Sequence, residues 1–204
     1  MTASPRRSLV TGANRGLGLE FTRHLLARGD HVIAACRHPG KATALNQLAG
    51  EHPGRLHVLP LDVADEKSRT AFAHELPLVT GGVDLLVNNA GVLHSGERWG
   101  NVGAANLEDS LRTNAMGPFL LTQALAPLLA DGATVANVSS MMSSLSSDPD
   151  FNAPSYRISK TALNMATLML AKALAPRGIA VIALCPAWRC STAAWCAART
   201  CCPC

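Results

Sequence analysis

The chain lacks the features that mark several large classes of protein. It has no run of about 18 apolar residues that would span a membrane, and its first residues do not resemble a signal peptide. Lys and Arg do not cluster beyond Arg6-Arg7, and the net charge is only +4, which argues against nucleic-acid binding. Cys36 is the only cysteine before residue 185, as is usual in a reducing compartment. We therefore expect a cytoplasmic protein without a nucleic-acid or membrane partner.

The composition that remains is typical of one well-buried globular domain. Hydrophobic residues make up 48% and charged residues 16% of the 204 residues, enough apolar material for a three-layer core. Neither an internal repeat nor a linker divides the chain before its last twenty residues. We expect a single domain over residues 1–184.

Short apolar runs alternate with longer helical patterns along this domain. The runs consist of Val, Ile, Leu and Ala without polar alternation, which is typical of parallel strands covered on both faces. Strand, helix and strand repeated in this way predict an α/β fold, a doubly wound parallel sheet in the order 3-2-1-4-5-6. The expected strands are Arg7 to Thr11, His31 to Cys36, Leu56 to Leu61, Val83 to Asn88, Thr134 to Ser139 and Ile179 to Leu184. The expected helices are one that ends at Gly29, followed by Lys41 to Ala49, Asp65 to Leu76, Ala104 to Leu129 and Ser155 to Ala175.

A glycine-rich turn, TGANRGLG, follows the first expected strand and opens the first helix. Gly12 permits the tight turn, and Gly16 lets the backbone approach a pyrophosphate, whose charge would lie at the helix N-terminus. Between a strand and an amphipathic helix, this run predicts dinucleotide binding rather than a purely structural turn. The predicted cofactor-binding residues of the turn are Gly12, Asn14, Arg15, Gly16, Leu17 and Gly18.

The region that sets cofactor preference contains no acidic residue. A carboxylate after the second strand would accept a hydrogen bond from the adenosine ribose and repel a 2′-phosphate, but none occurs from His31 to Gly50. Arg37 stands there instead, with Arg15 as a second candidate, and either guanidinium would favour a phosphorylated ribose. The sequence therefore predicts NADP(H) in preference to NAD(H), with two surface arginines as the alternative interpretation.

The only tyrosine of the chain, Tyr156, precedes Lys160 by one helical turn. Reduction of a carbonyl requires a hydride on carbon and a proton on oxygen, and a tyrosine with a pKa of about 10 exchanges protons poorly near neutrality. A lysine cation on the same helix face would stabilise the phenolate and lower that pKa. Ser139 and Ser140 lie upstream and supply a hydroxyl that could orient the substrate oxygen. Together these parts predict a hydride-transferring reductase.

Five ordered motifs resemble those of the short-chain dehydrogenase/reductase family over about Arg6 to Leu184. Besides the glycine turn, they are LDV at 61–63, NNAG at 88–91, NVSS at 137–140 and YRISK at 156–160, with Asn114 in LRTNAMGPF. The residues in and around these motifs are most similar to those of the C-factor and sniffer types of NADP-dependent carbonyl reductase. The resemblance implies a Rossmann fold, a small carbonyl compound as substrate, and a homo-oligomer, dimer or tetramer, that pairs through the helices at 104–129 and 155–175.

The resemblance also implies a catalytic set. Ser140 matches the substrate-orienting serine, with Ser143 and Ser144 as alternatives because the spacing from Ser140 to Tyr156 is longer than usual. Asn114 would interrupt its helix and hold a water that links the lysine to solvent. The implied catalytic residues are Ser140, Tyr156, Lys160 and Asn114.

Further residues are implied to bind the cofactor. Asp62 would hydrogen-bond the adenine amino group, although by itself it would be interpreted as a helix cap. The implied cofactor-binding residues outside the glycine turn are Arg37, Asp62, Val63, Asn89, Ala90, Gly91, Tyr156, Lys160 and Pro186, and no metal is implied.

The last twenty residues, 185–204, depart from the family and hold six of the seven cysteines. They begin like the family's Pro-Gly turn, with Ala187 in place of glycine, and then match nothing further. We expect a shifted reading frame or a truncated product, with the last strand and the substrate lid missing. A natural tail is one alternative. A metal site is the other, disfavoured because the spacing of its cysteines is not that of paired C-x-x-C ligands; they are Cys196, Cys201, Cys202 and Cys204.

The sequence thus predicts an oxidoreductase that transfers hydride between NADP(H) and a carbonyl or alcohol, with Tyr156 as general acid and base. The alternative is an NADP-binding protein with little or no turnover, acting as a binding or regulatory module. A missing substrate region would favour that alternative, because it would remove substrate contacts and the exclusion of water.

Overall fold

The computed structural model describes residues 5–146 and 151–186, and these contain one parallel sheet of six strands. The order is β3-β2-β1-β4-β5-β6, as the sequence predicts. Because β4 lies beside β1, the chain changes direction across the sheet at this pair, and open α/β sheets bind ligands at such a point. The strands are β1 (Arg7–Thr11), β2 (His31–Cys36), β3 (Leu56–Pro60), β4 (Val83–Asn88), β5 (Leu129–Val138) and β6 (Ala180–Leu184).

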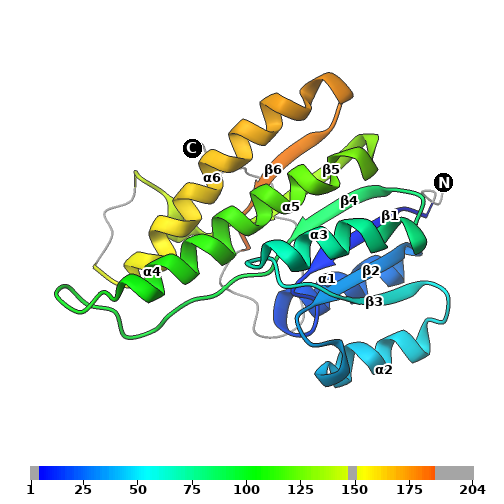
Figure 1. The fold of residues 1–204 in the computed structure, drawn as a ribbon, viewed down its shortest axis with the longest axis horizontal. Coiled ribbons are helices and arrows are strands. Elements are labelled where there is room, and N and C mark those ends of the chain that lie inside the picture. The colour runs from blue at the N-terminus through cyan, green and yellow to red at the C-terminus, as the bar shows by residue number, and fades with distance from the viewer. Residues whose placement is uncertain (1–4, 147–150, 187–204) are drawn as a thin grey trace.

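Helices cover both faces of the sheet (Figure 1). Leu9 and Val10 are neighbours in β1 and fully buried, yet they belong to different apolar clusters because successive side chains of a strand point to opposite faces. The Val10 cluster contains side chains of α1 (Gly16–Arg28) and α2 (Thr43–Glu51). The Leu9 cluster contains side chains of α3 (Glu66–Glu75), α5 (Gly117–Leu125) and α6 (Pro154–Leu174). The result is the three-layer arrangement expected from strands without polar alternation.

The predicted helix from Ala104 to Leu129 is interrupted at Asn114, as the resemblance implies. It consists of α4 (Ala104–Leu111) and α5, separated by a π-helical turn, Arg112–Met116. The helical path ends in a short 3-10 turn that contains Pro127, and β5 starts at Leu129 instead of the predicted Thr134. Proline cannot donate the next helical hydrogen bond, which explains why the chain leaves the helix there.

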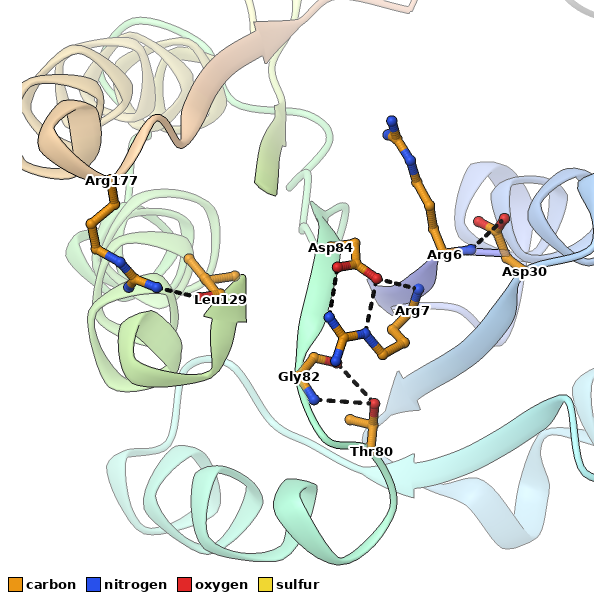
Figure 2. Close-up of polar contacts among 8 residues, drawn as sticks. All are labelled: Arg6, Arg7, Asp30, Thr80, Gly82, Asp84, Leu129 and Arg177. Atoms are coloured by element: carbon orange, nitrogen blue, oxygen red, sulfur yellow. Dashed lines mark hydrogen bonds and ion pairs between the residues drawn. The ribbon is translucent and has the colours of Figure 1, made fainter. Parts of the chain in front are cut away.

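Charged side chains are paired at the amino-terminal ends of the strands (Figure 2). Arg7 of β1 donates from Nε and Nη2 to the Asp84 carboxylate of β4 at 2.9 and 2.7 Å, and its backbone N–H adds a third contact at 2.8 Å. These hydrogen bonds lower the pKa of Asp84 and raise that of Arg7. Burial acts to raise the pKa of Asp30, which precedes β2, but hydrogen bonds, with Arg28 the strongest donor, outweigh it and leave that pKa lowered.

Candidate active site

The carboxyl ends of the strands meet at the opposite edge of the sheet and carry the predicted site residues. There β1 leads into the glycine turn, β4 into Asn89 and β5 into Ser139. A cavity of about 210 Å³ lies at this edge. It is lined by Leu17, Asn89, Gly91, Val92, Leu93, Val138, Tyr156 and Lys160.

The glycine turn has the close backbone approaches that the sequence predicts for it. Gly12 has a φ of 63°, and a Cβ there would lie 2.8 Å from the Cα of Ala90. A Cβ on Gly18 would lie 2.2 Å from the carbonyl oxygen of Gly12. Both positions therefore require glycine because a side chain would collide with backbone.

Thr11 and Asn89 join the glycine turn to the end of β4. Thr11 Oγ1 accepts hydrogen bonds from the backbone N–H groups of Asn89 and Ala90, both at 3.0 Å. Asn89 Nδ2 donates to the carbonyls of Thr11 and Gly12 at 3.0 and 3.2 Å. The amide of Asn89 is thus used to fix the turn, and Thr11 is a positioning residue that the sequence analysis did not single out.

The N-terminus of α1 has the character of an anion site. Its N-cap, Arg15, makes no capping hydrogen bond with its side chain, and the first turn contains no acidic residue. The backbone N–H groups of a first helical turn have no partner within the helix, and the helix dipole places positive charge there. This is the arrangement that binds phosphate in nucleotide-binding folds.

Two exposed arginines flank this N-terminus. Arg15 lies at the end of the glycine turn, and Arg37 directly follows β2. Neither guanidinium has a hydrogen-bond or ion-pair partner within residues 5–146 and 151–186. Asn14, between Gly12 and Arg15, is also exposed.

The LDV segment is fixed by hydrogen bonds between its residues and neighbouring residues of the chain. Asp62 accepts a hydrogen bond from the N–H of Ala64 at 3.0 Å, while Asp65 is the residue that caps α3. The carbonyl of Val63 accepts from buried Arg69 at 2.8 Å. A Cβ on Gly117 would lie 2.9 Å from that same carbonyl, so glycine lets the start of α5 approach Val63 closely. Asp62 is therefore not the helix cap that it would be by itself.

Tyr156 and Lys160 lie in the first turns of α6 and both line the cavity. Lys160 is 4% exposed, and its Nζ donates to the carbonyl of Val138 at 2.7 Å. The same Nζ lies 5.7 Å from the centre of the Tyr156 ring. The predicted helical spacing thus brings the cation beside the phenol ring.

Burial shifts the pKa values of Lys160 and Tyr156 in opposite directions. Burial lowers the pKa of Lys160 to about 8, because the cation loses water. Burial raises the pKa of Tyr156, and a hydrogen bond with Ser140 opposes the rise. The structure therefore shows a phenol whose pKa is above its ordinary value, whereas the sequence predicted a lowered one. The physical reason is desolvation of the phenolate by the apolar surroundings.

The structure brings Ser140, among the three candidate serines, to the phenol. Ser143 is buried, and its Oγ donates to the carbonyl of Ser140 and accepts from Asn164 at 2.9 Å. Ser144 is exposed and contacts Ser146. Ser140 Oγ accepts from the N–H of Met142 at 3.2 Å besides its hydrogen bond with Tyr156.

Asn114 lies in the π-helical turn and is fully buried. Its side chain binds the backbone of Val92 on both sides, with Nδ2 donating to the carbonyl and Oδ1 accepting from the N–H, each at 2.8 Å. Nδ2 also donates to Ser159 Oγ at 2.9 Å. A Cβ on Gly91 would lie 3.1 Å from Asn114 Oδ1 and 3.7 Å from Lys160 Nζ, so Gly91 lets these two groups converge.

The remaining predicted residues lie at the end of the described chain. Pro186 follows the carboxyl end of β6, and residues 187–204, with the four cysteines of the alternative metal site, lie outside the described residues. Within the described ranges, no group of three or more His, Cys, Asp or Glu side chains could hold a metal ion. Across those same ranges, no helix is both long and apolar enough to cross a membrane.

A family model described as short chain dehydrogenase matches residues 6–198. The chain belongs to the short-chain dehydrogenase family. The predicted family is therefore confirmed, and its other members include oxidoreductases of known structure.

Two solved members of the family resemble this chain closely in fold. The NADPH-bound carbonyl reductase from chicken fatty liver is 37% identical, with a TM-score of 0.84, over 90% of this chain and 80% of that one. The carbonyl reductase Sniffer of D. melanogaster is 32% identical, with a TM-score of 0.85, over 90% of this chain and 81% of that one. The C-signal protein of Myxococcus xanthus is 42% identical over 111 residues, which are 53% of this chain and 67% of that protein.

Proposed function

We propose that this short-chain dehydrogenase reduces a small carbonyl compound with NADPH and that Tyr156 is its proton donor. One observation carries the proposal: Tyr156 and Lys160 line the same cavity as Leu17 of the glycine turn and Gly91 of NNAG. A dinucleotide held by the glycine turn and a carbonyl held at the phenol would therefore share one cavity.

The residues around the cavity fit a phosphorylated dinucleotide. The uncapped N-terminus of α1 would receive the pyrophosphate, and exposed Arg37 and Arg15 would receive a 2′-phosphate. The LDV segment and residues Asn89 to Gly91 would line the rest of the site. When bound, NADPH would supply the hydride, and the chicken liver enzyme was solved with this cofactor.

The side chains around the phenol can carry the proton. Ser140 would orient the carbonyl oxygen, and Tyr156 would donate its proton to that oxygen as it becomes an alkoxide. Lys160 would stabilise the phenolate left behind, and its pKa of about 8 keeps most of it charged at pH 7. Asn114, which shares the contact at Gly91 with Lys160, would connect the lysine to solvent.

We further propose that two copies pair through the helices at 104–129 and 155–175. Supporting this, large apolar side chains on α6 and on the π-helical turn that follows α4 are about half exposed, which is typical of an interaction surface. They are Met116, Ile158, Met165, Leu168 and Met169. A cytoplasmic location stays a prediction of the sequence.

The proposed function is tested with the full chain by single-turnover oxidation of NADPH in the presence of aldehydes, ketones and quinones. We expect oxidation with at least one class and none without a carbonyl. Tight NADPH binding without oxidation by any of them would contradict the proposal and would favour the binding-module alternative.

A further inference from the structure

A buried carboxylate outside the predicted site holds the first turn of the helix that carries Tyr156. Glu97 belongs to the loop between β4 and α4 and is only 3% exposed. Its Oε1 accepts a hydrogen bond from Ser155 Oγ at 2.6 Å, and its Oε2 accepts from the backbone N–H of Ser155 at 3.2 Å. Ser155 is fully buried and directly precedes Tyr156.

Helix α6 lacks the capping group that Glu97 supplies. Its N-cap is Ala153, which has no side chain that could accept a hydrogen bond and which adopts a left-handed conformation with a φ of 43°. Pro154 follows and has no backbone N–H, so Ser155 provides the first donor of the helix. A carboxylate at this place satisfies that donor and lies at the positive end of the helix dipole.

The loop that carries Glu97 is itself tied to the cavity. It begins with Val92, which Asn114 holds through two backbone hydrogen bonds, and Val92 and Leu93 line the cavity. His94 Nε2 lies 2.9 Å from a carboxylate oxygen of Asp109 in α4. Glu97 therefore connects the wall of the cavity to the turn that presents Tyr156.

We propose that Glu97 is a positioning residue, which acts on the reaction through Ser155 and fixes the phenol of Tyr156 in the cavity. The inference rests on the proposed function only for its effect on turnover. Without Glu97, the first turn of α6 loosens, and water reaches the phenol. The glycine turn and α1 are not affected, so NADPH binding persists.

The test uses Glu97→Gln and Glu97→Ala, with Glu108→Gln as the matched control. Glu108 is an exposed carboxylate of α4 outside the site, so its replacement removes the same charge without touching Ser155. Tyr156 is the only tyrosine, and the absorbance of its phenolate therefore reports the phenol pKa directly. We expect Glu97→Ala to lower that pKa toward about 10, since burial is what raises it. We expect kcat to fall roughly three- to tenfold, as for loss of a helix cap, with KM and NADPH affinity nearly unchanged.

The conservative variant sharpens the test. Glutamine keeps one acceptor oxygen, so Glu97→Gln should lie between the unmodified protein and Glu97→Ala in both readouts. If Glu97→Ala does not fold, Ser155→Ala, which removes the 2.6 Å contact, replaces it and should also lower the phenol pKa. If the unmodified protein turns over no carbonyl, the proposed function fails, but the phenol titration still decides the role of Glu97. A phenol pKa and kcat as in Glu108→Gln, even with a lower melting temperature, would overturn the inference.

Discussion

The two ends of the sheet differ in whether their charged side chains have partners of opposite charge. At the amino end, Arg7 and Asp84 each hold the other in its charged form, and their pKa values move away from neutrality. At the carboxyl end, Lys160 faces a backbone carbonyl, has no carboxylate partner within the described residues, and has a pKa lowered to about 8. The comparison teaches that one end of the sheet is arranged for stability, whereas the other keeps groups that can exchange a proton near neutral pH.

Arg7 and Arg37 differ in the same way between the two ends of the sheet. Arg7 donates three hydrogen bonds to one carboxylate, counting its backbone N–H. Arg37 is exposed at the carboxyl end and has no partner among residues 5–146 and 151–186. The Arg7 guanidinium is bound to a carboxylate of the fold, while the Arg37 guanidinium is available to a phosphate.

The largest effect is expected at the phenol. Tyr156→Phe should lower turnover by about 10²–10⁴-fold, the usual contribution of a general acid, because the proton is needed as the alkoxide forms. NADPH affinity, measured by fluorescence titration, should stay within about twofold. Undiminished turnover in this variant would remove Tyr156 from the mechanism.

The contrast between the two arginines predicts the next effect. Arg37→Glu should weaken NADPH binding by roughly 10- to 100-fold, since a charge-assisted hydrogen bond contributes about 1.5–3 kcal/mol. It should narrow or reverse the preference over NADH. The matched control is Arg6→Glu, the same charge change at an exposed position of the amino end, which should leave the ratio of the two affinities unchanged. Equal affinities for both cofactors in the unmodified protein would contradict the assignment.

Lys160→Met should stabilise the fold while it lowers turnover. At pH 7 the lysine is protonated in both the folded and unfolded states, and its lowered pKa, about 8 against 10.5, means that burying the charge costs about 3 kcal/mol. Loss of the hydrogen bond to Val138 offsets about 1 kcal/mol or more, leaving a net gain of about 1–2 kcal/mol.

The stability difference between Lys160→Met and the unmodified protein should depend on pH. Between pH 8 and 10.5 the unfolded chain binds more protons than the folded one, so the unmodified protein gains stability as pH rises. The advantage of Lys160→Met in urea unfolding should therefore shrink over this window and reverse above it, where only the lost hydrogen bond remains. A variant that is less stable at pH 7 would show that the lysine serves the fold instead.

The smallest effect is expected at the amino end. Asp84→Asn should cost about 1–2 kcal/mol of unfolding free energy at pH 7, limited by solvent because both side chains of the pair are partly exposed. Since the pKa of Asp84 is lowered, this contribution is present above the ordinary carboxyl pKa and is lost as pH falls through the lowered value. NADPH affinity should not change. A clear drop in cofactor affinity would contradict the separation of the two ends.

The sequence was sufficient for the order of the strands and for the residues that the strand ends bring together. Apolar runs and glycine positions are local signals, and Gly12 and Gly18 are recognisable because no other residue fits them. Glu97 and Thr11 could not be singled out, because each acts through contacts with residues far along the chain, which no local pattern encodes. The direction of the Tyr156 pKa was also beyond reach, since burial is a property of the folded chain.

The central claim is that Tyr156 gives up its proton as hydride leaves NADPH, so that the oxidised ring stabilises the phenolate and lowers the pKa of the phenol. Because the chain has one tyrosine, a phenolate absorbance titration measures this pKa without interference. Without cofactor we expect a value above the ordinary 10, as burial dictates. With NADP⁺ bound, the positive nicotinamide ring should lower it. A phenol pKa that NADP⁺ binding leaves unchanged would contradict the account.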